Sequence, residues 1–139
     1  MQAGLRIDGA LGGQPRFQAI QEELAALGAK FSENLLDATN AFGEYVTDEA
    51  ELAGIPADVC QAAREAAEKE SKPGWKFTLH APSYGPLMQY ADDRALRARM
   101  YRAYATRASE HGNPDYDNTP LIGKLLKLRN EAARMLGYK

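Results

Sequence analysis

A single long helix most constrains how this chain can fold. Its apolar residues recur in steps of three and four, and the series consists of Phe17, Ile20, Leu24, Leu27, Phe31, Leu35, Ala38 and Phe42. This spacing predicts one apolar face on a helix of about seven turns. We expect the helix to open near Pro15, which suits a first helical turn, and to end at Gly43.

Within this helix the stretch KFSENLLDATNAF is unusually polar. Asn34, Asp37 and Asn40 stand between apolar positions, although these residue types have weak helix propensity. An exposed helix more often carries Glu, Lys, Gln or Arg at such places. The polar residues therefore indicate either contacts with neighbouring elements or exposure to water, and the sequence leaves both open.

The next part of the chain is acidic and carries a second helix. Residues 44–70 contain eight acidic and two basic side chains. Asp48 and Glu51 resemble a capping box that opens a single helical turn. A helix is predicted for residues 56–72, PADVCQAAREAAEKESK, because the Pro-Gly pair that follows would stop it.

The stretch GWKFTLHAP breaks the helical rhythm. Trp75, Phe77 and Leu79 alternate with polar residues, which is the period of a half-buried strand. We expect one short strand around residues 75–79. Residues 45–46 are expected to be only an extended link, so this strand has no evident partner in the chain.

Three helices are predicted in the second half of the chain. A short one begins at Pro86, and the acidic pair Asp92-Asp93 caps the next, RALRARMYRAYATRASE. The last runs from Thr119, whose side chain is expected to cap it, to the natural C-cap Gly137. Its wide apolar face, which needs neighbours on two sides, consists of Leu121, Ile122, Leu125, Leu126, Leu128, Ala132, Met135 and Leu136.

Together these elements predict an all-α helical bundle with one short strand. Residues 1–14 hold four glycines without a clear period, so we expect a loose lead-in there. Residues 15–139 are expected to form a single helical domain segment. The partnerless strand and the wide apolar face indicate a fragment of a larger domain.

The composition argues against several classes of function. Lys and Arg number 17 against 19 Asp and Glu, and the net charge of -2 argues against general binding to nucleic-acid phosphates. No apolar run approaches the roughly 20 residues that span a bilayer, and the N-terminus lacks the apolar core of a secretory signal. A single cysteine, Cys60, rules out an internal disulfide. We therefore expect a cytoplasmic protein without nucleic-acid or membrane partners.

Few residues are candidates for chemistry. His80 and His111 lie outside any HExxH motif, so no metal ligand is expected. Cys60 has no histidine near it in sequence and is expected to be a small buried residue. Ser83 and Tyr84 follow the strand at a helix entrance, where free N–H groups could hold a carboxylate or a carbonyl. We favour a rigid corner in which Tyr84 is packed, and contact with a ligand is the alternative.

Five arginines on one predicted helix raise a further possibility. They interleave with Tyr101 and Tyr104, as in proteins that bind single-stranded nucleic acids. At 100° per residue they spread around the helix, so we favour structural ion pairs with the acidic segment. The five are Arg94, Arg97, Arg99, Arg102 and Arg107.

Four stretches together resemble the thimet oligopeptidase family of zinc metallopeptidases. They are KFSENLLDATNAF, TDEAELAGIP, WKFTLHAPSYGPLMQYADDRALRARMYRAYATRASE and DNTPLIGKLLKLRNEAARMLGY, in that order. The resemblance implies a largely helical, cytosolic enzyme that hydrolyses short unstructured peptides in a deep channel. It also implies a zinc ion held by an HExxH helix and a downstream glutamate, and this sequence contains neither.

The resemblance therefore implies a non-catalytic segment of the channel wall, upstream of the zinc motif. No catalytic residue and no metal ligand is transferred to this chain, and Ser83 and Tyr84 are its candidates for contact with peptides. The implied partners are short peptides and the catalytic remainder of the same protein, with homo-oligomers if the chain is isolated. Asn34, Asp37 and Asn40 would then meet adjacent helix ends or the channel. The alternative is a stand-alone helical interaction module that lacks catalysis.

Overall fold

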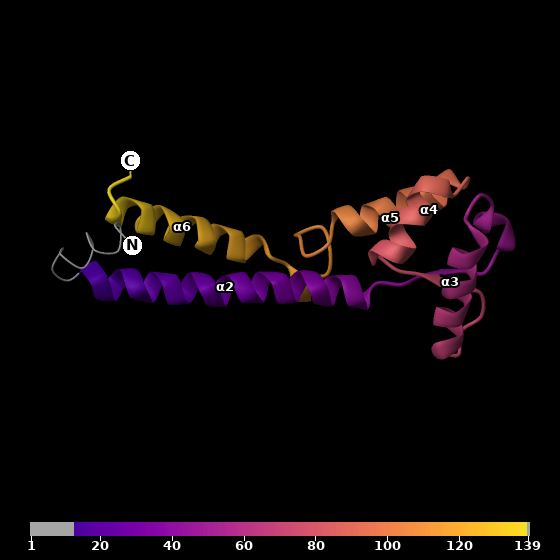
Figure 1. Cartoon of the computed structure of the whole chain (residues 1–139), viewed down its shortest axis with the longest axis horizontal. Coiled ribbons are helices and arrows are strands. Elements are labelled where there is room, and N and C mark those ends of the chain that lie inside the picture. Colours follow the sequence, from indigo (N-terminus) through magenta and orange to yellow (C-terminus); the bar gives the residue numbers. More distant parts are fainter. Residues whose placement is uncertain (1–12, 139) are drawn as a thin grey trace.

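The computed structural model describes residues 13–138, and Figure 1 shows them as an elongated, largely helical molecule. The elements, with η for a 3-10 helix, are α2 (Gly13–Ala41), β1 (Glu44–Val46), η1 (Glu49–Leu52), α3 (Ala57–Lys69), β2 (Trp75–Phe77), α4 (Ala81–Tyr90), α5 (Arg94–Ala105), η2 (Pro114–Tyr116) and α6 (Thr119–Met135). The predicted all-α class is confirmed. Of the lead-in expected at residues 1–14, residues 13 and 14 already belong to α2, and the rest lies outside the described residues.

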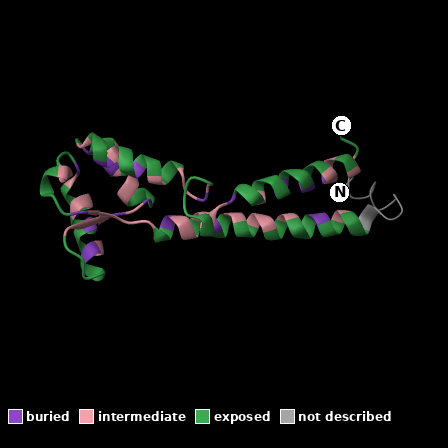
Figure 2. Cartoon of the chain, turned by 180° about the vertical axis from the view of Figure 1, so that it is seen from behind, coloured by how far each residue is buried: buried purple, intermediate pink, exposed green. Residues whose placement is uncertain are grey.

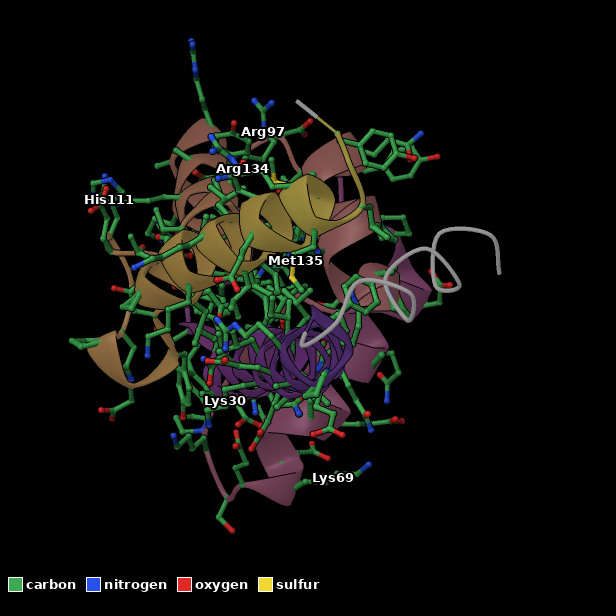
Figure 3. All side chains as sticks on the ribbon, turned by 90° about the vertical axis from the view of Figure 1, so that its left-hand side faces the viewer. Lys30, Lys69, Arg97, His111, Arg134 and Met135 are labelled. Atoms are coloured by element: carbon green, nitrogen blue, oxygen red, sulfur yellow. The ribbon has the colours of Figure 1, made fainter. Side chains whose placement is uncertain are left out.

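Helices α2 and α6 run antiparallel side by side and share the first of two cores (Figure 1). Ile20, Leu128 and Ala132 are buried there, and Met135 packs against them between the two helices (Figure 3). Towards the outer end, the guanidinium of Arg16 donates two hydrogen bonds of 2.6 and 2.9 Å to the carboxylate of Glu131. The apolar face predicted for the long helix is therefore covered in part by the last helix of the chain.

The second core lies at the other end of the molecule, among β1, α3, β2, α4 and α5. Its fully buried large side chains are Val46, Phe77, Leu87, Leu96 and Met100. Figure 2 shows buried residues on the small elements at this end of the molecule, whereas much of α2 is exposed. Phe42, just beyond α2, also packs against this core, so the end of the long helix joins the two cores.

The strand around Trp75 has a partner, which corrects the prediction of a single unpaired strand. β1 pairs with β2 in antiparallel register, with Tyr45 opposite Lys76. The Glu70 carboxylate accepts hydrogen bonds from Lys76 Nζ at 2.9 Å and from Tyr45 Oη at 2.8 Å, so it ties the two strands to the end of α3. β2 ends at Phe77, two residues earlier than expected. A strand of three residues is too short for its alternation to be visible, and for this reason the partner was missed.

Helix α4 begins at Ala81, so the predicted rigid corner at PSYGP and the helix start at Pro86 are wrong, whereas the predicted packing of Tyr84 is confirmed, since it packs against the second core. His80 occupies the N-cap position, Pro82 lies in the first turn, and Pro86 lies inside the helix. The first turn lacks intrahelical partners for its N–H groups in any helix, so Pro82 costs nothing there. Pro86 has no N–H, so the carbonyl four residues earlier lacks its helical hydrogen bond. The helix forms despite this loss because Leu87 packs into the second core.

The helix ends follow local capping chemistry. Asp93 Oδ1 accepts a hydrogen bond from the Leu96 N–H at 2.9 Å, which confirms the predicted cap of α5. At α6 the capping oxygen is Asp117 Oδ1, which accepts from the Thr119 N–H at 2.9 Å, so the predicted cap by the Thr119 side chain is wrong. Gly137 follows α6 at φ +91, the left-handed conformation that favours glycine, as expected for a C-cap. α2 ends at Ala41, two residues before the predicted Gly43.

The polar residues of α2 have different environments. Asn34 is buried and donates from Nδ2 to Asn118 Oδ1 at 2.9 Å, while Asn118 Nδ2 donates to the Phe31 carbonyl at 3.0 Å. Asn118 precedes α6, so an adjacent helix end satisfies Asn34, which confirms one of the two interpretations. Asn40 is exposed and Asp37 half-buried, so exposure to water accounts for Asn40. One asparagine pair therefore fixes the register of α6 on α2.

Candidate functional site

A hollow of about 370 Å³ lies where the end of α2 meets α4 and α5. We call it the junction hollow. Its lining residues are Thr39, Leu79, His80, Ala81, Tyr84, Gly85, Tyr104 and Arg107. A second hollow of about 240 Å³ shares Leu79 and Arg107 with it and extends towards Phe42 and Tyr116. Arg107 therefore stands between two adjoining spaces.

The wall of the junction hollow is a three-layer stack. The rings of Tyr84 and Tyr104 lie nearly parallel, with 4.3 Å between centroids and 12° between planes. The Arg107 guanidinium carbon lies 3.8 Å from the centroid of the same Tyr104 ring. Two groups this close to one centroid cannot share a face, so they cover opposite faces of Tyr104. Such stacking stabilises the arrangement of rings and cation by about 1 kcal/mol per contact.

Hydrogen bonds fix Arg107 further. Its Nε donates to the Tyr104 carbonyl at 3.1 Å, near the C-terminal end of α5, where a cation is electrostatically favoured. Its Nη1 donates to Thr39 Oγ1 at 3.0 Å, and that hydroxyl donates in turn to the Leu35 carbonyl at 2.8 Å. Arg107 thus joins α5 to α2 across 68 positions of sequence. The sequence indicated Arg107 only as one of five arginines and did not indicate Thr39 at all.

The two candidate residues for contact with a ligand, Ser83 and Tyr84, line different hollows beside α4. Tyr84 lines the junction hollow, where burial, and to a lesser degree Tyr104, raises the pKa of its hydroxyl. Ser83 instead lines a hollow of about 190 Å³ against α3, and its Oγ accepts a hydrogen bond from the Thr78 N–H at 2.9 Å. Tyr84 is therefore available to a ligand in the junction hollow, while Ser83 holds the end of β2 to α4.

The histidines do not come together as a metal site. His80 lines the junction hollow, whereas His111 lies on the outer surface (Figure 3), with its Nε2 3.5 Å from the adjacent Glu110 carboxylate. Within residues 13–138, no group of three or more His, Cys, Asp or Glu side chains could hold a metal ion. The described residues therefore do not fit a zinc ion.

Cys60 is half-buried in α3 and packs against the second core. Burial raises the pKa of its thiol, and the nearby Asp58 carboxylate adds to this effect. A raised pKa keeps the group in the unreactive thiol form at neutral pH. Cys60 was expected to be buried, and the structure shows that it packs against the core but is only half-buried.

The arginines of α5 differ in their contacts. Arg99 lies 2.9 Å from a Glu51 oxygen and 3.4 Å from a Glu44 oxygen, which confirms the predicted ion pairing for this residue. Glu51 therefore does not complete the expected capping box with Asp48, whose Oδ1 accepts from the Ala50 N–H alone. The pKa of Arg99 is raised, chiefly by its hydrogen bond to Glu51. Arg97 differs again, because its Nε is buried without a partner among the described residues.

An apolar groove of about 300 Å³ runs along the pair of long helices. Gly28 and Phe31 of α2 form one side, and Ile122, Leu125 and Leu126 of α6 form the other. Leu126 is 61% exposed, and Ile122 is 45% exposed. The wide apolar face predicted for the last helix is thus only partly covered by α2.

Comparisons with known proteins match nearly the whole chain. Residues 87–139 match peptidase family M3. Oligopeptidase A of Haemophilus influenzae is 47% identical over 128 residues, which cover 90% of this chain and 19% of that protein. Oligopeptidase A of Escherichia coli is 46% identical over 129 residues, which cover 91% of this chain and 19% of that protein. The probable cytosolic oligopeptidase A of Arabidopsis thaliana is 47% identical over 131 residues, which cover 88% of this chain and 18% of that protein. The chain spans about a fifth of the length of the curated relatives it matches.

Proposed function

The chain belongs to peptidase family M3, the thimet oligopeptidase family, and we propose that it forms a non-catalytic part of the channel wall of an oligopeptidase A-like enzyme. The enzyme would hydrolyse short, unstructured peptides. The observation that carries this proposal is the identity of nearly one half to oligopeptidase A along about nine tenths of the chain. The resemblance recognised from the four sequence stretches is confirmed by the same comparisons.

The chemistry of the described residues supports a non-catalytic role. Hydrolysis by a metallopeptidase needs a metal-bound water and a general base beside it. Among the residues that the structure describes, 13–138, no group of three or more His, Cys, Asp or Glu side chains could hold that metal ion. We therefore assign the zinc ion and its HExxH motif to a part of the enzyme outside this chain.

The uncovered surfaces support a place inside a larger helical assembly. The groove beside Leu126 leaves apolar side chains at the surface, and a neighbouring helix would bury them. The junction hollow then provides a polar and aromatic surface that could border a channel. A cytoplasmic location is part of the proposal. The relatives include a probable cytosolic protein and an organellar one of Arabidopsis thaliana, and none of the described helices meets the length and hydropathy needed to cross a membrane.

A chimera tests this function. The matching stretch of Escherichia coli oligopeptidase A is replaced by this chain, and cleavage of a quenched fluorescent peptide is followed with and without a chelator. We expect chelator-sensitive cleavage by the chimera and none by the 139-residue chain with added zinc. The control is the same enzyme with the stretch deleted, which should be inactive. A chimera that folds but does not cleave would contradict the channel-wall role, and zinc-dependent cleavage by the chain alone would contradict the non-catalytic role.

The same exposed groove favours a second candidate, a helical interaction module without catalysis. In that case the chain would hide Leu126 and Ile122 in a complex of its own. The chimera distinguishes the two candidates, because an interaction module has no reason to restore peptide cleavage to another enzyme.

A further inference from the structure

We propose that the junction hollow binds a carboxylate of a peptide, with Arg107 as the anchoring cation and with Tyr84 lining the same hollow across the Tyr104 ring. This inference rests on the proposed function, since it takes the ligand to be a peptide. Beyond that function, the inference specifies which group of the peptide is bound and which residues bind it. The carboxylate can belong to the C-terminus of the peptide or to an acidic side chain, and both have the same recognition chemistry.

Arg107 has free hydrogen-bond donors for such a ligand. A guanidinium carries about five N–H groups, and Arg107 uses Nε–H on the Tyr104 carbonyl and one Nη1–H on Thr39. One N–H of Nη1 and both of Nη2 are then left. In the part of the chain that the structure describes, Arg107 takes part in no ion pair. A planar guanidinium with adjacent free N–H groups matches the two oxygens of a carboxylate.

The guanidinium is ordered before a ligand binds. It is held against the Tyr104 ring at 3.8 Å on one side and by the Thr39 hydroxyl at 3.0 Å on another. A free arginine side chain loses much rotamer freedom when it binds an anion, which weakens affinity. Because Arg107 has already lost that freedom on folding, the hollow is preorganised for binding.

The surroundings of Arg107 favour negative charge. None of the described residues that line the hollow is an aspartate or a glutamate. The N-terminal turn of α4, entered at His80 and Ala81, borders the space, and a helix N-terminus carries partial positive charge. The Tyr84 hydroxyl stays protonated at neutral pH, because burial raises its pKa, so it can donate a hydrogen bond. The helix end adds to the charge of Arg107 and would not form a site alone.

The space has the size of a small-ligand site. Its volume of about 370 Å³ lies within the range of roughly 300–1000 Å³ for small-molecule pockets. The stacked Tyr84 and Tyr104 rings supply apolar surface for the residue that carries the carboxylate. A folded partner could not enter such a space, whereas the end of an extended peptide could.

The binding test uses the purified chain and three probe peptides. They are N-acetyl tetra-alanine with a free C-terminus, the same peptide as its C-terminal amide, and an amide with one alanine replaced by glutamate. We expect the free acid to shift the NMR resonances of Thr39, Tyr84 and Tyr104 on titration, and the plain amide to bind about tenfold more weakly or not at all. If the glutamate amide binds with the same affinity as the free acid, the site accepts any carboxylate. If it binds no more tightly than the plain amide, the site is specific for the C-terminal carboxylate.

Variants locate the binding. Arg107→Gln should abolish the preference for the free acid, and Arg107→Lys should keep only part of it, because an ammonium lacks the fork and the stacking plane. The matched control is Arg102→Gln, an exposed arginine of α5 that does not line the hollow. Equal binding of acid and amide by the unaltered chain would overturn the proposal. So would shifts centred away from Thr39 and Tyr84, even if Arg107→Gln failed to fold.

The chimera separates this inference from the proposed function. In an active chimera, Arg107→Gln should raise KM for free-acid peptides by a larger factor than KM for amidated peptides. If the chimera is active but the chain binds acid and amide alike, the inference is wrong and the proposed function stands. If the chimera is inactive and the chain prefers the free acid, the carboxylate site stands and the channel-wall function is wrong.

Discussion

The asparagine pair between α2 and α6 allows a quantitative prediction. Asn118→Ala removes the 2.9 Å hydrogen bond to Asn34 and the 3.0 Å hydrogen bond to the Phe31 carbonyl. Each is worth about 1 kcal/mol net, and the buried Asn34 amide left without its partner costs about 1–3 kcal/mol more. We therefore expect the free energy of unfolding to fall by about 3–5 kcal/mol. Asn118 makes no side-chain cap to α6, so no capping loss is added.

Urea denaturation followed by far-UV circular dichroism measures this loss. Asn34→Ala should lose about 2–4 kcal/mol, since one bond goes and the Asn118 oxygen is orphaned. The double variant orphans neither side chain and should lose only about 2 kcal/mol, well below the sum of the single losses. The control is Asn40→Ala, an exposed asparagine of the same helix, with a change within about 0.5 kcal/mol. Additive losses, or a loss for Asn118→Ala no larger than the control's, would refute the reasoning.

Four further predictions concern other parts of the chain. Gly54→Ala should destabilise the fold by about 2 kcal/mol or more in urea, because Gly54 has φ +87 and a Cβ there would lie 2.2 Å from the Tyr90 carbonyl oxygen. Gly28→Ala, a helical position with no atom within 4 Å of the added Cβ, should stabilise it by about 0.5–1 kcal/mol, and a loss there would contradict the geometry. The folded-state pKa of Glu70 is lowered, so its contribution to stability is present above the unfolded-state pKa and is lost as the pH falls through the folded-state pKa. Glu70→Gln should therefore flatten the acid limb of a stability–pH curve. An unchanged limb would count against a stabilising role for the hydrogen bonds of Glu70 with Lys76 and Tyr45. Light scattering should show concentration-dependent self-association of the isolated chain that Leu126→Glu reduces, and a monomer at high concentration would contradict this.

The fold was predictable where a sequence pattern extends over many residues. The apolar series from Phe17 spans many turns, so the long helix was predicted to within two residues at both ends. β1 was missed because Glu44–Val46 has only three residues, and its pairing is decided by β2 and by Glu70 from elsewhere in the chain. The start of α4 was missed because two prolines suggested a corner, whereas packing of Leu87 into the core decides in favour of a helix.

The candidate site was predictable only in part. Tyr84 was indicated by its place after the strand, a local signal. Arg107 and Thr39 lie 68 positions apart and meet only through tertiary packing, which no local pattern encodes. The stack that orders Arg107 depends on the angle between α4 and α5, and the sequence carries no direct signal for that angle.

The pairing of the first described helix with the last one has a consequence for biosynthesis. Arg16 and Glu131 meet across 115 positions of sequence, and Ile20 is buried against Leu128 and Ala132. A ribosome adding about 5–20 residues per second needs on the order of ten seconds to make the chain between them. Until α6 has been made, the apolar face of α2 lacks its partner. A nascent chain of this kind should recruit a chaperone that shields apolar segments until α6 emerges.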